Sequence, residues 1–258
     1  MTSQICVIPA RAGSVGVPGK NVAEIGGKSL VARSFHHSRI INPEGPVLLT
    51  TDSQDIVEVI AETAGVLSPR IDSIEPGGIL QTPEFFLHRR LPEQASSSAR
   101  IAEVLQSIRR RLTATGIDLN VWTLLQPTSP FRSQNELVEF RQRLEEADDK
   151  TSIVSVKDVD DFHPARMYSM TLDHQLVSLG LGEGLEAANR QELPSIYIRD
   201  GGFYVIGDAL VRAGKQFSSQ AIGVVREFPW TINIDKPEDL LLARLIGSVE
   251  GEAVGLGG

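Results

Sequence analysis

The sequence has one cysteine, few aromatic residues and no long apolar run. Because Cys6 is the single cysteine among 258 residues, no disulfide can form within the chain. Aromatic residues make up 5%, so we expect a core built mainly from aliphatic side chains. No segment has the length and apolarity of a membrane span, and no secretory signal pattern opens the chain. We expect a cytoplasmic protein with no membrane partner.

Basic residues are also few. The chain has 25 Lys and Arg against 33 Asp and Glu, a net charge of −8, and no basic block. A nucleic-acid-binding surface requires clustered positive charge. We therefore expect no nucleic-acid partner, although a local cationic pocket remains compatible with this composition.

Strand-like apolar runs alternate with helical patterns along the chain. The runs lie at 4–10, 46–52, 121–127, 151–156, 202–206 and 222–225. Helical patterns lie at 30–40, 54–64, 98–114, 135–147 and 237–246. This alternation predicts a three-layer α/β fold with a mostly parallel sheet. We expect one domain over 1–248, an inserted subdomain at 157–199 where the pattern loosens, and a disordered tail at 249–258.

A glycine-rich loop, PARAGSVGVPGKN at 9–21, joins the first strand to the first helix. Ligands of open α/β sheets bind at this edge. The glycines let successive backbone amides point toward one anion, and Arg11 and Lys20 add positive charge. A plain connection of this kind usually takes about two to six residues. The loop therefore predicts a phosphate site.

The loop matches neither common phosphate-binding template. Five residues separate Gly13 from Gly19 where a P-loop has four, and Asn21 stands where a P-loop has Ser or Thr. The glycine spacing also departs from the dinucleotide fingerprint.

The same loop resembles the signature of the acylneuraminate cytidylyltransferases (CMP-sialic acid synthetases), which make CMP-activated sugar acids. Six further stretches resemble that family in the same order: TTDSQDIVEVI, LLQPTSPFR, HP at 163–164, RQELP, GGFY and INIDKPEDL. The likeness runs from Ile5 to Leu240. It implies the Rossmann-like fold of nucleotide-diphospho-sugar transferases, with 157–199 as a dimerisation and acceptor subdomain and a homodimer as the assembly.

The resemblance implies that an acceptor oxygen attacks the α-phosphorus of CTP and that pyrophosphate leaves. Both substrates are anionic, so catalysis would depend on positioning and charge neutralisation. It also implies Mg²⁺, which prefers one or two carboxylates plus phosphate oxygens. Two alternatives stay open: transfer to a different acceptor, such as a phosphonate or sugar phosphate, and a regulatory homologue with impaired catalysis.

The resemblance also assigns residues to roles. The catalytic set is Arg11, Lys20 and Asp235. The nucleotide-binding set is Ala10, Gly13, Ser14, Asn21, Arg90 and Ser97. The acceptor-binding set is Gln126, Arg190, Asp200 and Tyr204, with Arg190 reaching across the dimer. The metal ligands are Asp235 and Asn233.

Several of these residues have a structural alternative. Asp235 could cap the last helix, and Gln126 could belong to a rigid proline-rich turn. Tyr204 could be a core aromatic on a strand. We prefer Arg90 to Arg89 as the nucleotide-binding arginine.

Three positions depart from the family pattern. Val15 stands where a lysine is typical, Asp200 where an asparagine is typical, and Asn233 where an aspartate is typical. The first two changes each lower the net charge of the expected pocket by about one unit. The acceptor would then carry less negative charge, or an amino group that pairs with Asp200. Because Asn233 is neutral, we expect it to bind magnesium more weakly than a carboxylate.

Overall fold

A single twisted sheet forms the centre of the structure. The computed structural model describes residues 3–13, 16–179, 192–227 and 231–254. The sheet has eight strands in the order β12-β8-β11-β7-β1-β4-β6-β5. Its strands are β1 (Gln4–Pro9), β4 (Val47–Thr51), β5 (Ile79–Gln81), β6 (Phe86–Arg89), β7 (Val121–Leu124), β8 (Ser152–Asp158), β11 (Tyr197–Gly207) and β12 (Ile222–Val225). Only β5 and β11 run against the others, so the expected mostly parallel sheet is confirmed.

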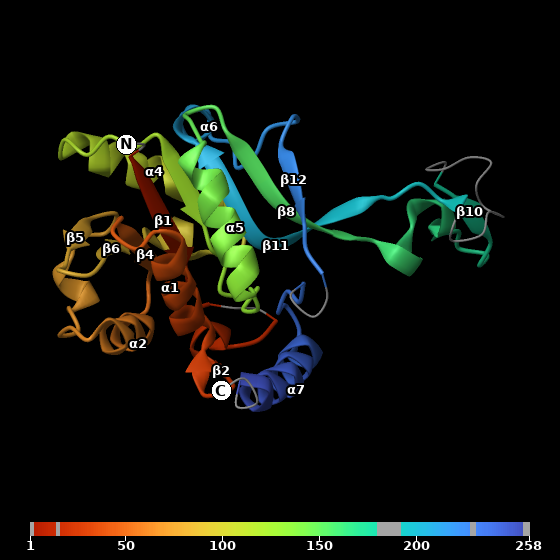
Figure 1. Ribbon diagram of the computed structural model, residues 1–258, viewed down its shortest axis with the longest axis horizontal. Helices are drawn as coiled ribbons and strands as arrows, with labels where there is room; N and C mark the ends of the chain where they lie inside the picture. The colour runs from red at the N-terminus through yellow and green to blue at the C-terminus, as the bar shows by residue number, and fades with distance from the viewer. Residues whose placement is uncertain (1–2, 14–15, 180–191, 228–230, 255–258) are drawn as a thin grey trace.

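Helices cover both faces of the sheet (Figure 1). The helices α1 (Leu30–Ile41), α2 (Gln54–Ala64) and α5 (Gln134–Glu145) pack on one face, and α4 (Ile101–Ala114) and α6 (Asp208–Arg212) pack on the other. Alternation along β1 explains this arrangement, because Cys6 and Ile8 belong to the first core cluster while Ile5 and Val7 belong to the second. The expected three-layer α/β fold is therefore confirmed.

Serine residues begin the helices next to the glycine-rich loop and the sheet edge. The hydroxyl oxygens of Ser29, Ser53 and Ser133 accept backbone hydrogen bonds at the starts of α1, α2 and α5. Short elements complete this part of the chain: η1 (Lys20–Val22), β2 (Glu24–Ile25), β3 (Lys28–Ser29), η2 (Ile71–Ser73) and α3 (Pro92–Ala95).

The last helix, α7 (Pro237–Val254), is longer than expected. We predicted helix only to 246 and disorder over 249–258. An isolated glycine costs a helix about 1 kcal/mol, which is too little to end it. At Gly247 the missing side chain also permits packing, because a Cβ there would lie 2.3 Å from Cγ2 of Ile25 in β2. Residues 255–258 lie outside the described residues.

The segment expected as a subdomain forms an arm that extends from the body (Figure 1). The ends of β8 and β11 pair along the base of this arm. The arm also contains η3 (Asp160–Phe162), η4 (Pro164–Arg166) and the strand pair β9 (Tyr168–Met170) and β10 (Leu176–Ser178). Several apolar side chains on it are exposed to solvent, among them Phe162, Leu172 and Ile198.

Candidate active site

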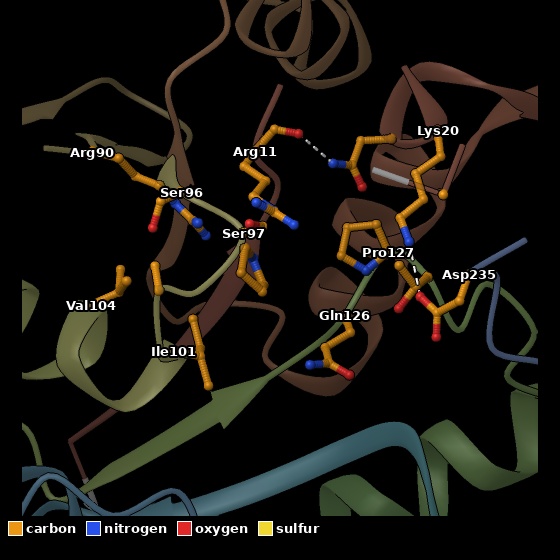
Figure 2. A pocket seen from close by; sticks show the side chains of 15 residues that line it. Arg11, Lys20, Arg90, Ser96, Ser97, Ile101, Val104, Gln126, Pro127 and Asp235 are labelled. Carbon is orange, nitrogen blue, oxygen red and sulfur yellow. Dashed lines mark hydrogen bonds and ion pairs between the residues drawn. The ribbon is translucent and has the colours of Figure 1, made fainter. Parts of the chain in front are cut away.

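A cavity of about 360 Å³ opens at the carboxyl ends of β1, β6 and β7. Four segments supply its wall: the loop after β1, the segment from β6 into α4, the loop after β7, and the segment before the last helix. Its lining residues are Pro9, Arg11, Gly16, Lys20, Asn21, Arg90, Ser96, Ser97, Ala99, Ile101, Val104, Gln126, Pro127, Thr128 and Asp235. Figure 2 shows Arg90 and Ser97 on one side and Lys20 and Asp235 on the other, with Arg11 between them. Residues far apart in sequence therefore share one polar, largely cationic cavity.

Hydrogen bonds tie the described ends of the glycine-rich loop to its neighbours. Asn21 Nδ2 donates to the Arg11 carbonyl oxygen at 2.8 Å, and the Ala12 backbone N–H donates to Asp52 Oδ1 at 2.7 Å. At Gly16 the loop passes so close to the backbone of Asp235 that a Cβ would lie 1.9 Å from its carbonyl oxygen. Only glycine allows that approach. The close contact brings the loop against the segment that carries the expected metal ligand, Asp235.

Lys20 and Asp235 form an ion pair on one side of the cavity. Lys20 Nζ lies 3.0 Å from Asp235 Oδ1 and also donates to the Ile234 carbonyl oxygen at 2.7 Å. The other carboxylate oxygen, Oδ2, accepts from Asn233 Nδ2 at 2.8 Å. Asp235 does not cap α7, because Asp239 Oδ2 accepts the backbone N–H groups there. The Asp235 carboxylate is therefore available to the cavity.

The donor set at Asp235 fits a magnesium ion that is shared with phosphate, and does not fit an all-protein cage. The Asp235 side chain is 62% exposed and already attracts a cation, the Lys20 ammonium group. Within the described residues no three His, Cys, Asp or Glu side chains are grouped to hold a metal. Magnesium commonly takes one or two protein carboxylates and completes its shell with phosphate and water.

Arg90 is almost buried at the opposite end of the cavity. Its Nε donates to Thr50 Oγ1 and its Nη1 donates to the Gln94 carbonyl oxygen, both at 3.2 Å. Burial lowers the pKa of Arg90 to about 10, with Asp52 opposing and Arg11 adding to the shift. The group is still a cation at neutral pH. Arg89 points elsewhere, since its Nη1 donates to the Ile74 carbonyl oxygen at 2.6 Å.

Gln126 lines the cavity after β7, next to Gly201 of β11. Gly201 has φ +78°, and a Cβ on it would lie 2.9 Å from Gln126 Oε1. Arg132 joins the two strands, because its Nη2 donates to the carbonyl oxygens of Gln126 at 3.0 Å and Gly202 at 2.8 Å. Burial lowers the pKa of Arg132 to about 9. The loop that carries Gln126 is thus tied to β11.

Comparisons with known proteins agree with this geometry. A family model described as "Cytidylyltransferase" matches residues 5–73, which include the glycine-rich loop. A CMP-N,N'-diacetyllegionaminic acid synthase of Legionella pneumophila is 25% identical over 252 residues, which cover 97% of this chain and 98% of that protein. The chain is therefore similar to a cytidylyltransferase over nearly its whole length, and its glycine-rich loop lies within the matched family segment.

Two further comparisons show lower sequence identity, and one of them covers only part of the relative's length. An N-acylneuraminate cytidylyltransferase of Streptococcus agalactiae is 23% identical over 92% of this chain, and the chain spans 51% of that relative's length. A structure of CMP:2-keto-3-deoxy-manno-octonic acid synthetase complexed with CTP has a TM-score of 0.63 at 12% identity, covering 96% of this chain and 100% of the other. The expected nucleotidyltransferase fold is confirmed.

Two residues expected to bind the acceptor of a cytidylyltransferase lie in the interior instead. Asp200 Oδ2 is 2.7 Å from Arg226 Nη1, and the Asp200 side chain has no exposed surface. Tyr204 lies in the second core cluster on β11, and burial raises the pKa of its hydroxyl. Neither side chain lines the cavity. Tyr204 is thus a core aromatic on a strand, as its structural alternative describes.

The remaining expected residues divide into three groups. The structure brings Arg11, Lys20, Asn21, Arg90, Ser97, Gln126 and Asp235 to the cavity. Ala10, Gly13 and Asn233 do not line it, and the Ala10 backbone N–H is used in sheet pairing with the Thr50 carbonyl oxygen at 3.0 Å. Ser14, Val15 and Arg190 lie outside the described residues.

Sequence reasoning missed residues that hold the site together. Arg132 stands inside the quoted LLQPTSPFR stretch, so its place in a family motif was a signal that could have found it. Arg226 follows β12 and has no such signal, because its partner Asp200 becomes its neighbour only in the folded chain. The close approach of Gly16 to Asp235 likewise exists only in the folded chain.

Proposed function

We propose that this chain transfers CMP from CTP to a sugar acid and releases pyrophosphate. The observation that carries the proposal is the concentration of Arg11, Lys20 and Arg90 around one cavity in a chain with a net charge of −8. Cations of this kind suit a triphosphate. The names of the relatives, which describe synthases of CMP-activated sugar acids, support the same acceptor class.

The proposed reaction is one displacement at phosphorus. A bond forms between the acceptor hydroxyl oxygen and the α-phosphorus of CTP. The bond from that phosphorus to the bridging oxygen breaks, pyrophosphate takes the electron pair, and the hydroxyl proton passes to solvent. Arg11 and Lys20 neutralise the negative charge of the triphosphate, and Gln126 orients the acceptor. Fixed charges of this kind need no reorganisation during the reaction.

We place magnesium at Asp235, with Asn233 beside it. When bound there, the ion would supply charge neutralisation to the phosphate oxygens. Lys20, which pairs with Asp235 in this structure, would then turn its ammonium group to phosphate. We place the reaction in the cytoplasm, where nucleoside triphosphates are made.

We also propose that two copies of the chain form a C2 dimer through the arm. The arm exposes apolar side chains such as Phe162 and Ile198, and a cavity of about 710 Å³ at its base is lined by Met167, Val225 and others. Because a C2 contact places the same surface on both partners, an apolar arm beside an apolar hollow is suited to self-association. Light scattering at micromolar concentration tests this. Ile198→Asp should give a monomer and Leu67→Asp, on an exposed site away from the arm, should not.

Pyrophosphate release tests the proposed function. The wild-type protein is incubated with CTP, magnesium and a panel of sugar acids, phosphonates and sugar phosphates. Release should require a sugar acid, and Lys20→Ala should slow it while Lys28→Ala, at an exposed position outside the cavity, should not. CTP binding without release in any mixture would instead indicate a regulatory protein.

A further inference from the structure

Thr50, His88 and Arg90 lie side by side on the sheet edge that carries the cavity. Thr50 of β4 pairs in register with His88 of β6. Alternate residues along an extended chain share a face, so Arg90 follows His88 on the same side. Thr50 Oγ1 lies 3.2 Å from Arg90 Nε and 2.9 Å from His88 Nδ1. Both Thr50 and His88 are fully buried.

Both hydrogen bonds of Thr50 hold its hydroxyl in place. A guanidinium can only donate, so Thr50 Oγ1 accepts from Arg90. The bond between Thr50 Oγ1 and His88 Nδ1 is donated by the hydroxyl or by the ring, according to the imidazole tautomer. Burial lowers the pKa of His88 to about 4, with the Arg90 and Arg111 cations adding to the shift, so the ring is neutral at pH 7. His88 thereby holds Thr50 Oγ1 where it accepts from Arg90.

The guanidinium of Arg90 is held at two of its nitrogens. Thr50 holds Nε, and the Gln94 carbonyl oxygen holds Nη1. Gln94 is itself fixed, because its Oε1 accepts the Leu91 backbone N–H at 3.2 Å. The remaining nitrogen, Nη2, donates to no acceptor within the part of the chain that the structure describes, and the guanidinium points toward the cavity (Figure 2).

We propose that Thr50 and His88 are positioning residues that orient Arg90 toward the nucleoside part of CTP. The proposal rests on the proposed function. Arg90 lies on the same side of the cavity as Ile101 and Val104, a partly apolar wall suited to a base and ribose, and away from Lys20 and Asp235 at the expected phosphate end (Figure 2). A guanidinium held at Nε and Nη1 presents its remaining donors in one plane, which suits a flat polar base edge.

Calorimetric titration of CTP into four variants tests this role. Thr50→Val removes both hydrogen bonds without changing the shape of the side chain, and Thr50→Ser keeps the hydroxyl. Loss of a hydrogen bond to a charged group should raise the Kd for CTP about tenfold in Thr50→Val and leave it near the wild-type value in Thr50→Ser. The other variants are Arg90→Gln and the double variant Thr50→Val/Arg90→Gln. If Thr50 acts through Arg90, the double variant should bind CTP as weakly as Arg90→Gln alone.

Tripolyphosphate, which lacks the nucleoside, is the matched ligand. Its Kd should be the same in all four variants and the wild type. The positioning role is overturned if Thr50→Val binds CTP as the wild type does, if it weakens CTP equally with and without Arg90, or if it weakens tripolyphosphate too. Where Thr50→Val does not fold, His88→Phe, which removes the second hydrogen-bond partner of Thr50 Oγ1, is titrated in the same way. A wild-type protein that binds no CTP would overturn the proposed function itself.

Discussion

Replacing Asp200 by asparagine tests the buried ion pair that replaces the expected acceptor contact. Asp200 Oδ2 lies 2.7 Å from Arg226 Nη1, and the two side chains are 0% and 1% exposed. Asp200 Oδ1 accepts the Gly202 backbone N–H at 3.0 Å and the Ser155 hydroxyl. Asp200→Asn keeps the shape and an acceptor for those two donors. It removes one charge that balances Arg226, while Glu136 Oε1 keeps its contact with Arg226 Nε at 3.0 Å.

The expected loss follows from that geometry. Removing one partner of a buried ion pair costs about 3–5 kcal/mol of unfolding free energy, because a desolvated charge loses its balance. Since Glu136 still contacts Arg226, we expect the lower end, about 3 kcal/mol, measured by urea unfolding at pH 7. Arg226→Met should cost a similar amount. The double variant Asp200→Asn/Arg226→Met should cost less than the two losses together, because neither partner is then left charged.

The outcome that contradicts this reasoning is a small effect. If Asp200→Asn loses less than about 1 kcal/mol, the pair contributes no more than an exposed salt bridge does. The Asp200 carboxylate would then be solvated rather than interior, and a contact with the acceptor would again be open. Binding of CTP is the matched control, since Asp200 does not line the cavity and the Kd should not change.

Three further predictions concern single residues. Lys20→Ala should slow pyrophosphate release on the order of 10²-fold in a steady-state assay, with little change in the urea midpoint, because a preorganised cation is lost from a polar loop. Gly16→Ala should impair CTP binding in calorimetry, since its Cβ would lie 1.9 Å from the Asp235 carbonyl oxygen and the loop must move. Lowering the pH should destabilise the protein through His88, whose pKa falls from 6.5 to about 4 by burial. As the pH falls, His88 is protonated in the unfolded chain before it is protonated in the folded protein. Up to about 3 kcal/mol of unfolding free energy is therefore lost between about pH 6.5 and 4. Urea unfolding at several pH values measures this loss, and the change of unfolding free energy with pH should be smaller in His88→Phe.

The elements that could be predicted from the sequence are those set by local pattern. Apolar runs predicted β1, β4, β7 and β8, and the helical pattern at 54–64 predicted α2, which the Ser53 hydroxyl caps. The short strands β5 and β6, at one end of the sheet, were missed, since each has too few residues for a clear alternation. The glycine-rich loop predicted the cavity, because a parallel sheet gathers its ligand at one edge.

The positions that depart from the family pattern show why the net charge of the site could not be predicted from the sequence. A charged residue adds to that net charge only if its side chain reaches the cavity and no opposite charge balances it. Asp200 was expected to make the pocket more negative, but Arg226 balances it in the interior, so it gives no reason to expect an amino group on the acceptor. Asn233 differs, because its amide nitrogen donates directly to the Asp235 carboxylate. An aspartate there would repel that carboxylate and increase the attraction for a cation. Of these two substitutions, Asn233 is therefore the one that contacts the proposed metal ligand, and we propose that it lowers the affinity for magnesium.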